Sequence, residues 1–346
     1  MAGGTGGHVF PALAVAEYLK KKQWDVFWLG GTKGLERQVL DLEISRTLFI
    51  RFAGVRRNGV LGWLKLPLNL VLAIFNVIKF LIKNKPNVVI GFGGYVTVPG
   101  GIAAKLCRCP LVIHEQNAIP GLSNRLLAKL SKKILLGFPN TMPKGVHVGN
   151  PLRSAFSSIP PPEVRYRERN GRLKILIVGG SLGAKVFNDI LPIAISRIPE
   201  NERPCVMHQS GRNKLTELRK SYDRLGVSAT LLEFIEDMSA AYAQADLVIS
   251  RGGALSVSEI ASVGVASFLI PYPFAVDDHQ MRNSEFLANL GGAIVIPESE
   301  LNPDFLAKAL LNLDRASLLE MGVKAKLADM FGATTLVGQQ IEDLMR

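Results

Sequence analysis

The stretch LKILIVGGSLGAKVF, residues 173–187, has the order of a β-strand, a glycine turn and the start of an α-helix. Residues 175–178 are all apolar, which is typical of a strand buried on both faces in a parallel sheet covered by helices. The opening stretch AGGTGGHVFPALAVAEYL, residues 2–19, has nearly the same order of residue types. This repetition predicts two α/β halves of similar architecture.

A second pair of stretches supports the repeat: NVVIGFGGYVTVPGGIAA begins at Asn87, and DLVISRGGALSVSEIASVG begins at Asp246. Each half therefore contains two apolar strands that break at a Gly-Gly pair and continue into a helix. Between the halves, the triple proline and the charged residues of the segment 151–170 indicate a linker. We expect two doubly wound parallel-sheet domains with a cleft between them.

The start of the chain departs from this scheme. A central strand should precede Gly3, as one precedes Gly179, but only Met1 and Ala2 stand there. We therefore expect the first strand to be truncated or missing. A misassigned start or a shortened chain would explain this.

The composition is that of a folded protein with a large core, since 48% of the 346 residues are hydrophobic and only 20% are charged. The formal net charge of +12 indicates attraction to phosphate on nucleic acid, on anionic lipid or on a small diphosphate. The basic residues are scattered, without a basic tail, zinc-finger spacing or an RNA-binding aromatic signature. This pattern disfavours nucleic acid as a partner.

The cysteines and the first residues indicate the compartment. Cys107, Cys109 and Cys205 give neither a disulfide framework nor the paired spacing of a zinc site, so we expect reduced thiols. The first residues lack the basic and apolar regions of a secretory signal, which predicts a protein that stays in the cytoplasm.

One long apolar stretch, residues 60–83, raises the question of a membrane helix. On a helical wheel its polar residues fall within one stripe about 80° wide; they are Lys65, Asn69, Asn76, Lys79 and Lys83. A polar stripe along the whole length argues against spanning. Two alternatives remain: a helix largely buried against a sheet, or a segment that rests with Trp63, Arg56 and Arg57 in a lipid headgroup layer.

The four glycine turns predict phosphate binding, because such a turn lets an anion approach the backbone N–H groups and the positive end of the next helix. Each turn alone is explained equally well by tight packing. The second strand, around WDVFWLGGTKG, ends without the carboxylate that a dehydrogenase uses for the adenosine ribose, so nicotinamide chemistry is disfavoured. GGSLGAK also lacks the form of a P-loop.

Seven motifs in this order resemble the MurG family: GGTGGHVFPALAVA, GFGGYVTVPG, HEQNAIPG, VGNPLR, VGGSLGA, EFIEDM and RGGALSVSEIA. The resemblance implies a GT-B fold of two Rossmann-like domains. Residues 1–153 plus a returning last helix, 332–346, would form the acceptor and membrane-associated domain, and residues 154–331 the UDP-GlcNAc-binding domain. It also implies an inverting glycosyltransferase of peptidoglycan synthesis, which moves GlcNAc from UDP-GlcNAc to the muramyl C4 hydroxyl of lipid I and so makes lipid II.

This activity would place the protein peripherally at the cytoplasmic face of the cell inner membrane, with an anionic membrane surface as a partner. Its cell-wall product connects it with cell shape and cell division. No cofactor is implied. Asp277, Asp278 and His279 form a lone run without a second ligand cluster, so we expect no metal site.

Inversion by direct displacement needs a base for the acceptor hydroxyl and a group that holds the departing diphosphate. His8, at the first glycine turn, is the candidate base. The alternative is that His8 only caps the turn or binds acceptor phosphate. His114 and Glu115 are second candidates, favoured as structural supports.

The resemblance implies the binding residues. Thr5, Gly6 and Gly7 would approach the sugar and diphosphate, Asn117 the GlcNAc hydroxyls, and Arg153 the nucleotide. Ser181 would bind a phosphate, and the backbone of Ile235 would pair with uracil. In the remaining set, a helix N-terminus would hold the α-phosphate, Glu259 the ribose and Gln280 the donor sugar. The members of this set are Ala254, Leu255, Ser256, Val257, Ser258, Glu259 and Gln280.

Two rival functions remain open. One is another GT-B enzyme that uses a UDP-sugar, such as a UDP-GlcNAc 2-epimerase, which would ignore lipid I. The other is a non-catalytic nucleotide binder at the membrane, in which the missing first strand has abolished turnover. Fold alone does not separate them.

Overall fold

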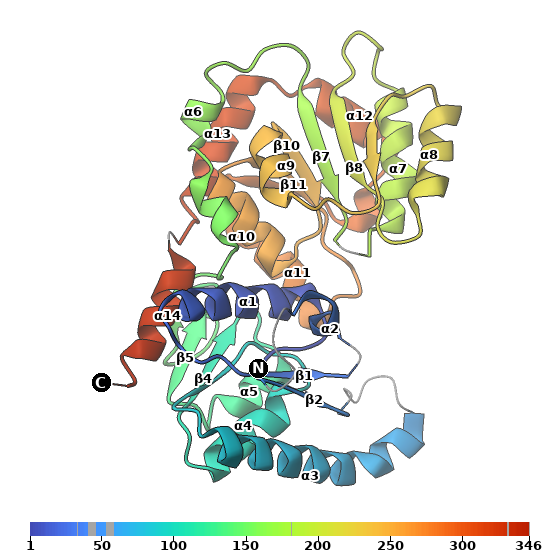
Figure 1. The fold of residues 1–346 in the computed structure, drawn as a ribbon. Coiled ribbons are helices and arrows are strands. Elements are labelled where there is room, and N and C mark those ends of the chain that lie inside the picture. The colour runs from blue at the N-terminus through green and yellow to red at the C-terminus, as the bar shows by residue number, and fades with distance from the viewer. Residues whose placement is uncertain (33, 41–45, 53–58, 181, 331, 346) are drawn as a thin grey trace. The chain divides into compact units, whose positions relative to one another are not determined.

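The computed structural model describes the chain except residues 33, 41–45, 53–58, 181, 331 and 346, and it describes no side chains for residues 59–65. The chain divides into two compact units: unit 1 is Met1–Arg153 with Gly332–Arg346, and unit 2 is Ser154–Phe331. Each unit consists of parallel strands with helices packed on them (Figure 1). This is the doubly wound α/β class that the sequence predicts.

Unit 1 contains a two-stranded sheet, β1–β2, and a four-stranded sheet in the order β3–β4–β5–β6, and all pairs are parallel. The strands are β1 (Trp28–Gly31), β2 (Thr47–Ile50), β3 (Val89–Gly91), β4 (Leu111–Glu115), β5 (Lys133–Leu136) and β6 (Val146–His147). The helices are α1 (Gly6–Lys21), α2 (Glu36–Val39), α3 (Gly59–Asn84), α4 (Thr97–Leu106), α5 (Leu122–Leu127) and α14 (Ala333–Glu342). The last of these packs against α1, and Val337 and Ile341 share a core with Val9 and Val15.

Met1 and Ala2 join the two sheets of unit 1. The Met1 amino group donates to the Ile90 carbonyl at 2.7 Å, and the Met1 carbonyl accepts from the Phe92 N–H at 2.9 Å. On the other side, the Ala2 N–H donates to the Leu29 carbonyl at 3.2 Å. These two residues therefore lie between β1 and β3, where the sequence analysis expects a truncated central strand.

Unit 2 has one parallel sheet in the order β12–β11–β10–β7–β8–β9. Its strands are β7 (Lys174–Val178), β8 (Cys205–Gln209), β9 (Thr230–Leu232), β10 (Leu247–Ser250), β11 (Ala266–Leu269) and β12 (Ala293–Val295). Its α-helices are α6 (Pro162–Arg165), α7 (Lys185–Ser196), α8 (Leu215–Arg224), α9 (Met238–Gln244), α10 (Ala254–Val263), α11 (His279–Ala288), α12 (Pro303–Leu311) and α13 (Arg315–Lys326). Short 3₁₀ turns are η3 (Ser154–Ser158), η4 (Val276–Asp278) and η5 (Glu298–Glu300).

The strand order of unit 2 reverses between β7 and β10, which pair from Ile175–Leu247 to Val178–Ser250. Both strands are buried along this paired length, and apolar side chains of α7 and α12 share a core with Ile175 and Leu247. The glycine turns that follow these two strands therefore emerge side by side at the carboxyl edge. Open α/β sheets bind their ligands at such a switch point.

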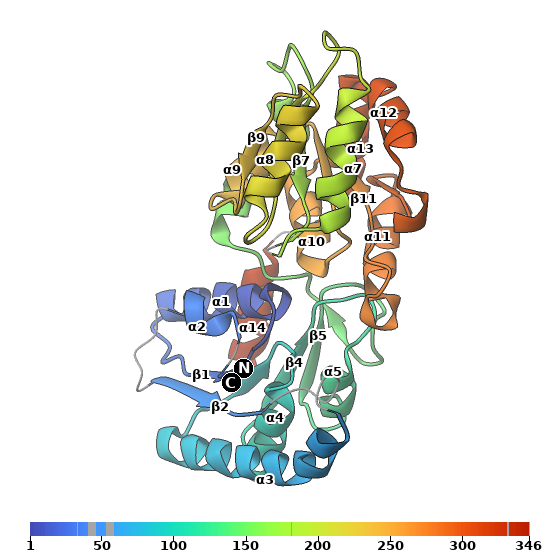
Figure 2. The ribbon, with the colours of Figure 1, turned by 90° about the vertical axis from the view of Figure 1, so that its right-hand side faces the viewer.

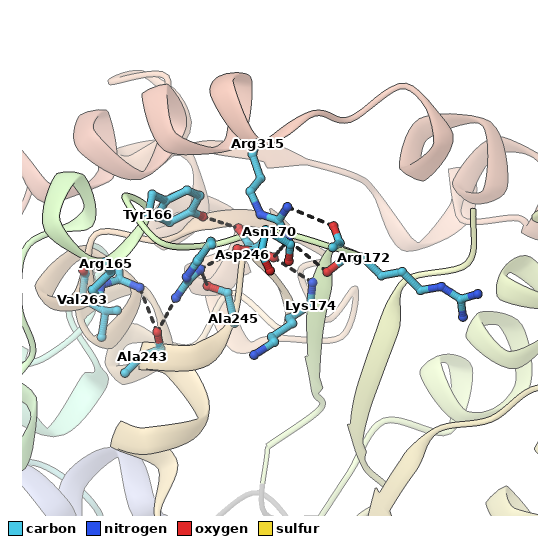
Figure 3. A network of polar contacts seen from close by, with 12 residues as sticks. Arg165, Tyr166, Asn170, Arg172, Lys174, Ala243, Ala245, Asp246, Val263 and Arg315 are labelled. Atoms are coloured by element: carbon cyan, nitrogen blue, oxygen red, sulfur yellow. Dashed lines mark hydrogen bonds and ion pairs between the residues drawn. The ribbon is translucent and has the colours of Figure 1, made fainter. Parts of the chain in front are cut away.

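A buried ion-pair network fixes the segment after α6 to the sheet of unit 2 (Figure 3). The Asp246 carboxylate is fully buried and pairs with Arg169 at 2.5 Å and with Arg315 at 3.4 Å. It also accepts from the Lys174 N–H at 2.8 Å, at the start of β7. The Tyr166 hydroxyl donates to the Asp246 carbonyl at 2.9 Å, which completes the attachment.

Helix α3 packs on α4 through Ala73, Val77 and Leu81 (Figures 1 and 2). Its segment Leu66–Asn84 is long and apolar enough to cross a membrane by length and composition, with 17% of it buried. The alternative of a largely buried helix is therefore wrong. Its exposed apolar side chains are Leu68, Val71, Leu72, Phe75 and Ile82. Arg56 and Arg57 lie outside the described residues, as does the side chain of Trp63.

Candidate functional site

The first glycine turn of unit 1 is held by a buried carboxylate that the sequence analysis missed. Glu36 accepts hydrogen bonds from the Gly31 N–H at 2.7 Å and from the Gly4 N–H at 3.1 Å. A Cβ atom on Gly3 would lie 2.9 Å from the same carboxylate. The strand end thus does have an acidic residue nearby, but its oxygens are used by the backbone and are buried, so it is no ribose ligand. The sequence signal was the acidic residue shortly after Gly30 and Gly31.

Helix α1 begins directly after this turn, with Thr5 as its N-cap and Gly6 and Gly7 in its first turn. The Thr5 side chain is exposed and makes no capping hydrogen bond. In the same first turn His8 is half-buried, and its Nδ1 lies 2.9 Å from Oε1 of Gln116. Gly93, at φ +95°, makes room for the imidazole, because a Cβ atom there would lie 2.8 Å from His8 Nδ1.

His114 and Glu115, the second candidates for the base, are both fully engaged. His114 is buried at the end of β4, with Nε2 2.9 Å from the Gly149 carbonyl and Nδ1 2.9 Å from Gln116 Nε2. Burial lowers the pKa of His114 to about 4, so the ring is neutral at physiological pH. Neither of its nitrogens is available to a substrate proton.

The Glu115 carboxylate orders the loop that follows β4. One oxygen accepts from the backbone and side-chain N–H groups of Asn117, at 3.0 and 3.2 Å. The other accepts from the Gly121 N–H and from Asn124 Nδ2, both at 2.9 Å. Glu115 is thus a support, and it holds Asn117 at the carboxyl end of β4. Arg153 lies beside α1, with its guanidinium 5.7 Å from the centre of the Phe10 ring.

In unit 2, Gln209 links two segments of the predicted nucleotide site. Its Nε2 donates to the Gly180 carbonyl in the turn after β7, and its Oε1 accepts from the Ile235 N–H, both at 2.9 Å. The Ile235 N–H is therefore already bonded in this structure, and the sequence analysis did not foresee this. Ser181, the predicted phosphate ligand of the same turn, lies outside the described residues.

The second glycine turn of unit 2 leads into α10, whose N-cap is Gly253. Val257 is the first residue to donate within the helix, to the Gly253 carbonyl at 3.0 Å. The N–H groups of Ala254, Leu255 and Ser256 therefore form its open N-terminus. The predicted ligands Ser258 and Glu259 follow one turn later and are half-buried; the Ser258 hydroxyl donates to the Ala254 carbonyl at 2.9 Å.

Gln280 lies against this turn, as the tight contacts of Gly252 show: a Cβ atom there would lie 2.3 Å from the Gln280 carbonyl oxygen. The Gln280 Oε1 accepts from the Tyr272 N–H at 3.0 Å, which leaves its amide NH₂ as the donor for a ligand. The structure thus brings Gln280 to the N-terminus of α10. In the part of the chain that the structure describes, no three His, Cys, Asp or Glu side chains gather in a metal-binding group.

Arg251 is a further residue that the sequence analysis missed. It pairs with Glu298 at 2.5 Å and lies over the rings of Phe187 and Tyr272, at 4.9 and 5.4 Å from their centres. The sequence feature that could have marked Arg251 as a site residue is its position directly before Gly252 and Gly253. The guanidinium holds the turn and the Tyr272 loop together.

The chain matches the glycosyltransferase family 28 N-terminal domain over residues 1–136 and the corresponding C-terminal domain over residues 174–333. It is 47% identical over 342 residues to the UDP-N-acetylglucosamine–N-acetylmuramyl-(pentapeptide) pyrophosphoryl-undecaprenol N-acetylglucosamine transferase of Nitrosospira multiformis, covering 98% of this chain and 96% of the relative. The protein of the same name from Polynucleobacter asymbioticus is 48% identical over 99% of this chain and 96% of the relative.

Solved structures agree with these relatives. The MurG crystal structure from Acinetobacter baumannii is 38% identical, with a TM-score of 0.84 over 99% of this chain and 98% of that one. A UDP-GlcNAc 2-epimerase from Neisseria meningitidis has a TM-score of 0.67 over 98% of both chains, but it is only 14% identical. The second likeness shows a shared fold and nothing finer.

Proposed function

This chain belongs to the MurG family and is a UDP-GlcNAc-dependent N-acetylglucosamine transferase of peptidoglycan synthesis, and we propose how its two units divide the reaction. Unit 2 binds UDP-GlcNAc, and unit 1 supplies the base and binds the acceptor, lipid I. The transfer forms lipid II. The observation that carries the family assignment is an identity of 47% or 48% to named transferases along nearly the whole chain.

The donor binds through backbone groups and a few side chains of unit 2. The open N–H groups of Ala254, Leu255 and Ser256 hold the α-phosphate, because the positive end of a helix favours an anion. Glu259, one turn later, accepts the ribose hydroxyls. Since the Ile235 N–H is bonded to Gln209, the Ile235 carbonyl is the group left to accept from uracil N3–H. Ser181 binds a phosphate.

The donor sugar is recognised by amide groups. The free NH₂ of Gln280 donates to a GlcNAc hydroxyl, since its oxygen is held by Tyr272. In unit 1 we assign the contacts with the sugar and diphosphate to Thr5, Gly6 and Gly7. Asn117 binds the GlcNAc hydroxyls, and Arg153 binds the nucleotide. Amide donors discriminate by geometry, because a hydroxyl placed differently leaves a polar group unpaired.

His8 is the general base. The muramyl C4 oxygen attacks the anomeric carbon while the bond to UDP breaks, and the hydroxyl proton goes to His8 Nε2. One displacement inverts the anomeric centre. The geometry supports this role, because His8 Nδ1 is held by Gln116 while Nε2 has no hydrogen-bond partner among the described residues. The departing diphosphate is stabilised by the N-terminus of α10.

The exposed apolar side of α3 rests on the membrane surface, so the protein is peripheral at the cytoplasmic face of the inner membrane. The opposite side packs on α4 through Ala73 and Val77, and a helix that is part of a protein core cannot be surrounded by lipid. Lys79 and Lys83 lie exposed on the same helix and attract anionic headgroups.

The test is transfer of radiolabelled GlcNAc from UDP-GlcNAc to a lipid I analogue, with UDP-GalNAc as the control donor. We expect labelled lipid product from UDP-GlcNAc alone. Equal use of both donors would contradict the role of Gln280. A His8→Ala variant should lose about 100-fold or more in kcat, since a positioned base contributes about 10²- to 10⁴-fold.

A further inference from the structure

A chain of hydrogen bonds runs from Gly149 to His8, and its first member fixes the direction of all the others. The Gly149 carbonyl can only accept, so His114 Nε2, at 2.9 Å, carries a hydrogen. Burial lowers the pKa of His114 to about 4, so the ring is neutral. Its Nδ1 therefore bears a lone pair and accepts a hydrogen bond.

Gln116 is oriented by two acceptors of the same residue. Its side-chain nitrogen lies 2.9 Å from His114 Nδ1 and 3.0 Å from the His114 carbonyl oxygen. Both N–H bonds of the amide are thus used, and Oε1 must face the other way, toward His8. The reversed amide would place its oxygen against two acceptors in a buried site and would leave both of their hydrogen bonds unmade.

The last step concerns His8. Oε1 of Gln116 accepts only, so His8 Nδ1, at 2.9 Å, carries the hydrogen of the neutral imidazole. The other nitrogen, Nε2, then bears the lone pair. Gly93 permits this arrangement because a larger residue would occupy the space of the His8 ring.

We propose that Gln116 is a positioning residue for the transfer, which holds His8 in the tautomer whose Nε2 is free to accept the acceptor proton. Gln116 touches no substrate itself and acts through His8, while His114 and the Gly149 carbonyl set the orientation of its amide. The proposal rests on the proposed role of His8 as the base.

The direct test is the tautomer of His8 in the wild-type protein without substrate. Long-range ¹H–¹⁵N correlation of protein labelled with ¹⁵N in its histidine rings reports which nitrogen carries the hydrogen at pH 8. The chain has five histidines, and the His8 signals are assigned by their loss in His8→Ala. We expect hydrogen on Nδ1 and a lone pair on Nε2. Hydrogen on Nε2 would overturn the proposal.

The kinetic test uses Gln116→Met, which keeps a long unbranched side chain but removes both polar ends. We expect a loss of roughly 100-fold in kcat, a change of less than about twofold in the KM for UDP-GlcNAc, and a His8 ring no longer held with hydrogen on Nδ1. Wild-type kcat in this variant would contradict the role of Gln116. The matched control is Gln209→Met in unit 2, which removes a buried glutamine far along the sequence and should leave the His8 tautomer unchanged.

Gln116→Glu is the second variant: one carboxyl oxygen still accepts from His8 Nδ1–H, and the other, when it is protonated, donates to His114 Nδ1 as the amide does. It should recover at least about tenfold in kcat over Gln116→Met. A Glu variant no better than the Met variant would count against the hydrogen-bond argument.

The two proposals fail in different ways. If His8→Ala transfers GlcNAc at the wild-type rate, His8 is not the base, whatever its tautomer. If wild-type His8 carries hydrogen on Nε2 and the protein still needs His8 for transfer, the proposal that His8 is the base is kept. The proposal that Gln116 sets its tautomer is then rejected.

Discussion

The Glu36 carboxylate accepts the Gly4 N–H at 3.1 Å, so an acidic side chain from after β1 holds the glycine turn in front of α1. The same carboxylate accepts the Gly31 N–H at 2.7 Å. Gly4 has φ +100°, a conformation that favours glycine, and the bond to Glu36 keeps it there. The position of His8, four residues later, depends on this turn.

Glu36→Gln should therefore weaken both the fold and the reaction. The new NH₂ group must face one of two backbone donors, which costs about 1–3 kcal/mol in unfolding free energy. We also expect a fall in kcat, because the turn that carries His8 is displaced. Urea unfolding and the transfer assay measure the two effects. Glu17→Gln, at an exposed position on α1, is the control; equal stability of both variants would refute the argument.

Asp246→Ala should destabilise unit 2 by about 3–5 kcal/mol, because it leaves Arg169 and Arg315 without their buried counter-charge (Figure 3). Urea unfolding measures the loss. Asp223→Ala removes an exposed carboxylate from α8 and should change stability by less than about 0.5 kcal/mol. A small effect at Asp246 would mean that the two arginines find other partners.

Stability should fall as the solution is acidified below pH 6.5, partly because of His208. Burial lowers the pKa of His208 in the folded protein to about 3, so between that value and 6.5 the unfolded chain binds more protons. Above pH 6.5 the protonation of His208 costs the folded protein no stability. At pH 5 it lowers the free energy of unfolding by about 2 kcal/mol. His208→Gln does not titrate and should reduce this slope, whereas His279→Gln, at a more accessible position, serves as the control. Parallel unfolding curves for the wild type and His208→Gln would contradict the prediction.

Gln209→Ala should weaken donor binding by about tenfold, or about 1.4 kcal/mol. The substitution releases the Ile235 N–H and the Gly180 carbonyl together, so the uracil and phosphate segments lose their common support. Calorimetric titration with UDP measures the effect. His8→Ala is the control, because it should leave the affinity for UDP near the wild-type value; unchanged UDP affinity in Gln209→Ala would disprove this role.

Leu72→Glu should reduce binding to anionic vesicles by several-fold, because it places a negative charge among the exposed apolar side chains of α3. Co-sedimentation with phosphatidylglycerol vesicles measures it. Leu327→Glu changes a still more exposed leucine of unit 2 and should have little effect. We expect the Leu72 variant to keep its rate on a short-chain, water-soluble acceptor. Equal vesicle binding by both variants would rule out α3 as the membrane surface.

The α/β class was predictable because the strands that lead into the Gly-Gly pairs, such as β7 and β10, are mostly apolar and buried. The register Ile175–Leu247 to Val178–Ser250 pairs the two strands that the repeat singled out. The family assignment from the seven motifs is confirmed by the named relatives. The individual site residues, His8 among them, remain predictions.

The supports of the site were not predictable from local pattern. Gln116 stands inside the HEQN motif, yet its bond to His8 joins residues 108 positions apart. Glu36 and Gln209 act in the same way, through backbone N–H groups of distant segments. Sequence periodicity reports which face of an element is buried, but it contains no information on which buried polar groups meet.

Unit 1 cannot be completed during synthesis until its last helix, α14, has been made. Val337 and Ile341 complete the core around Val9 and Val15, but the ribosome makes all of unit 2 in between. At about 5–20 residues per second, the first part of unit 1 waits roughly ten seconds or more for its last helix. A nascent chain stalled before residue 332 should therefore expose the side of α1 that α14 covers in the whole protein, which is a surface for chaperones rather than for substrate.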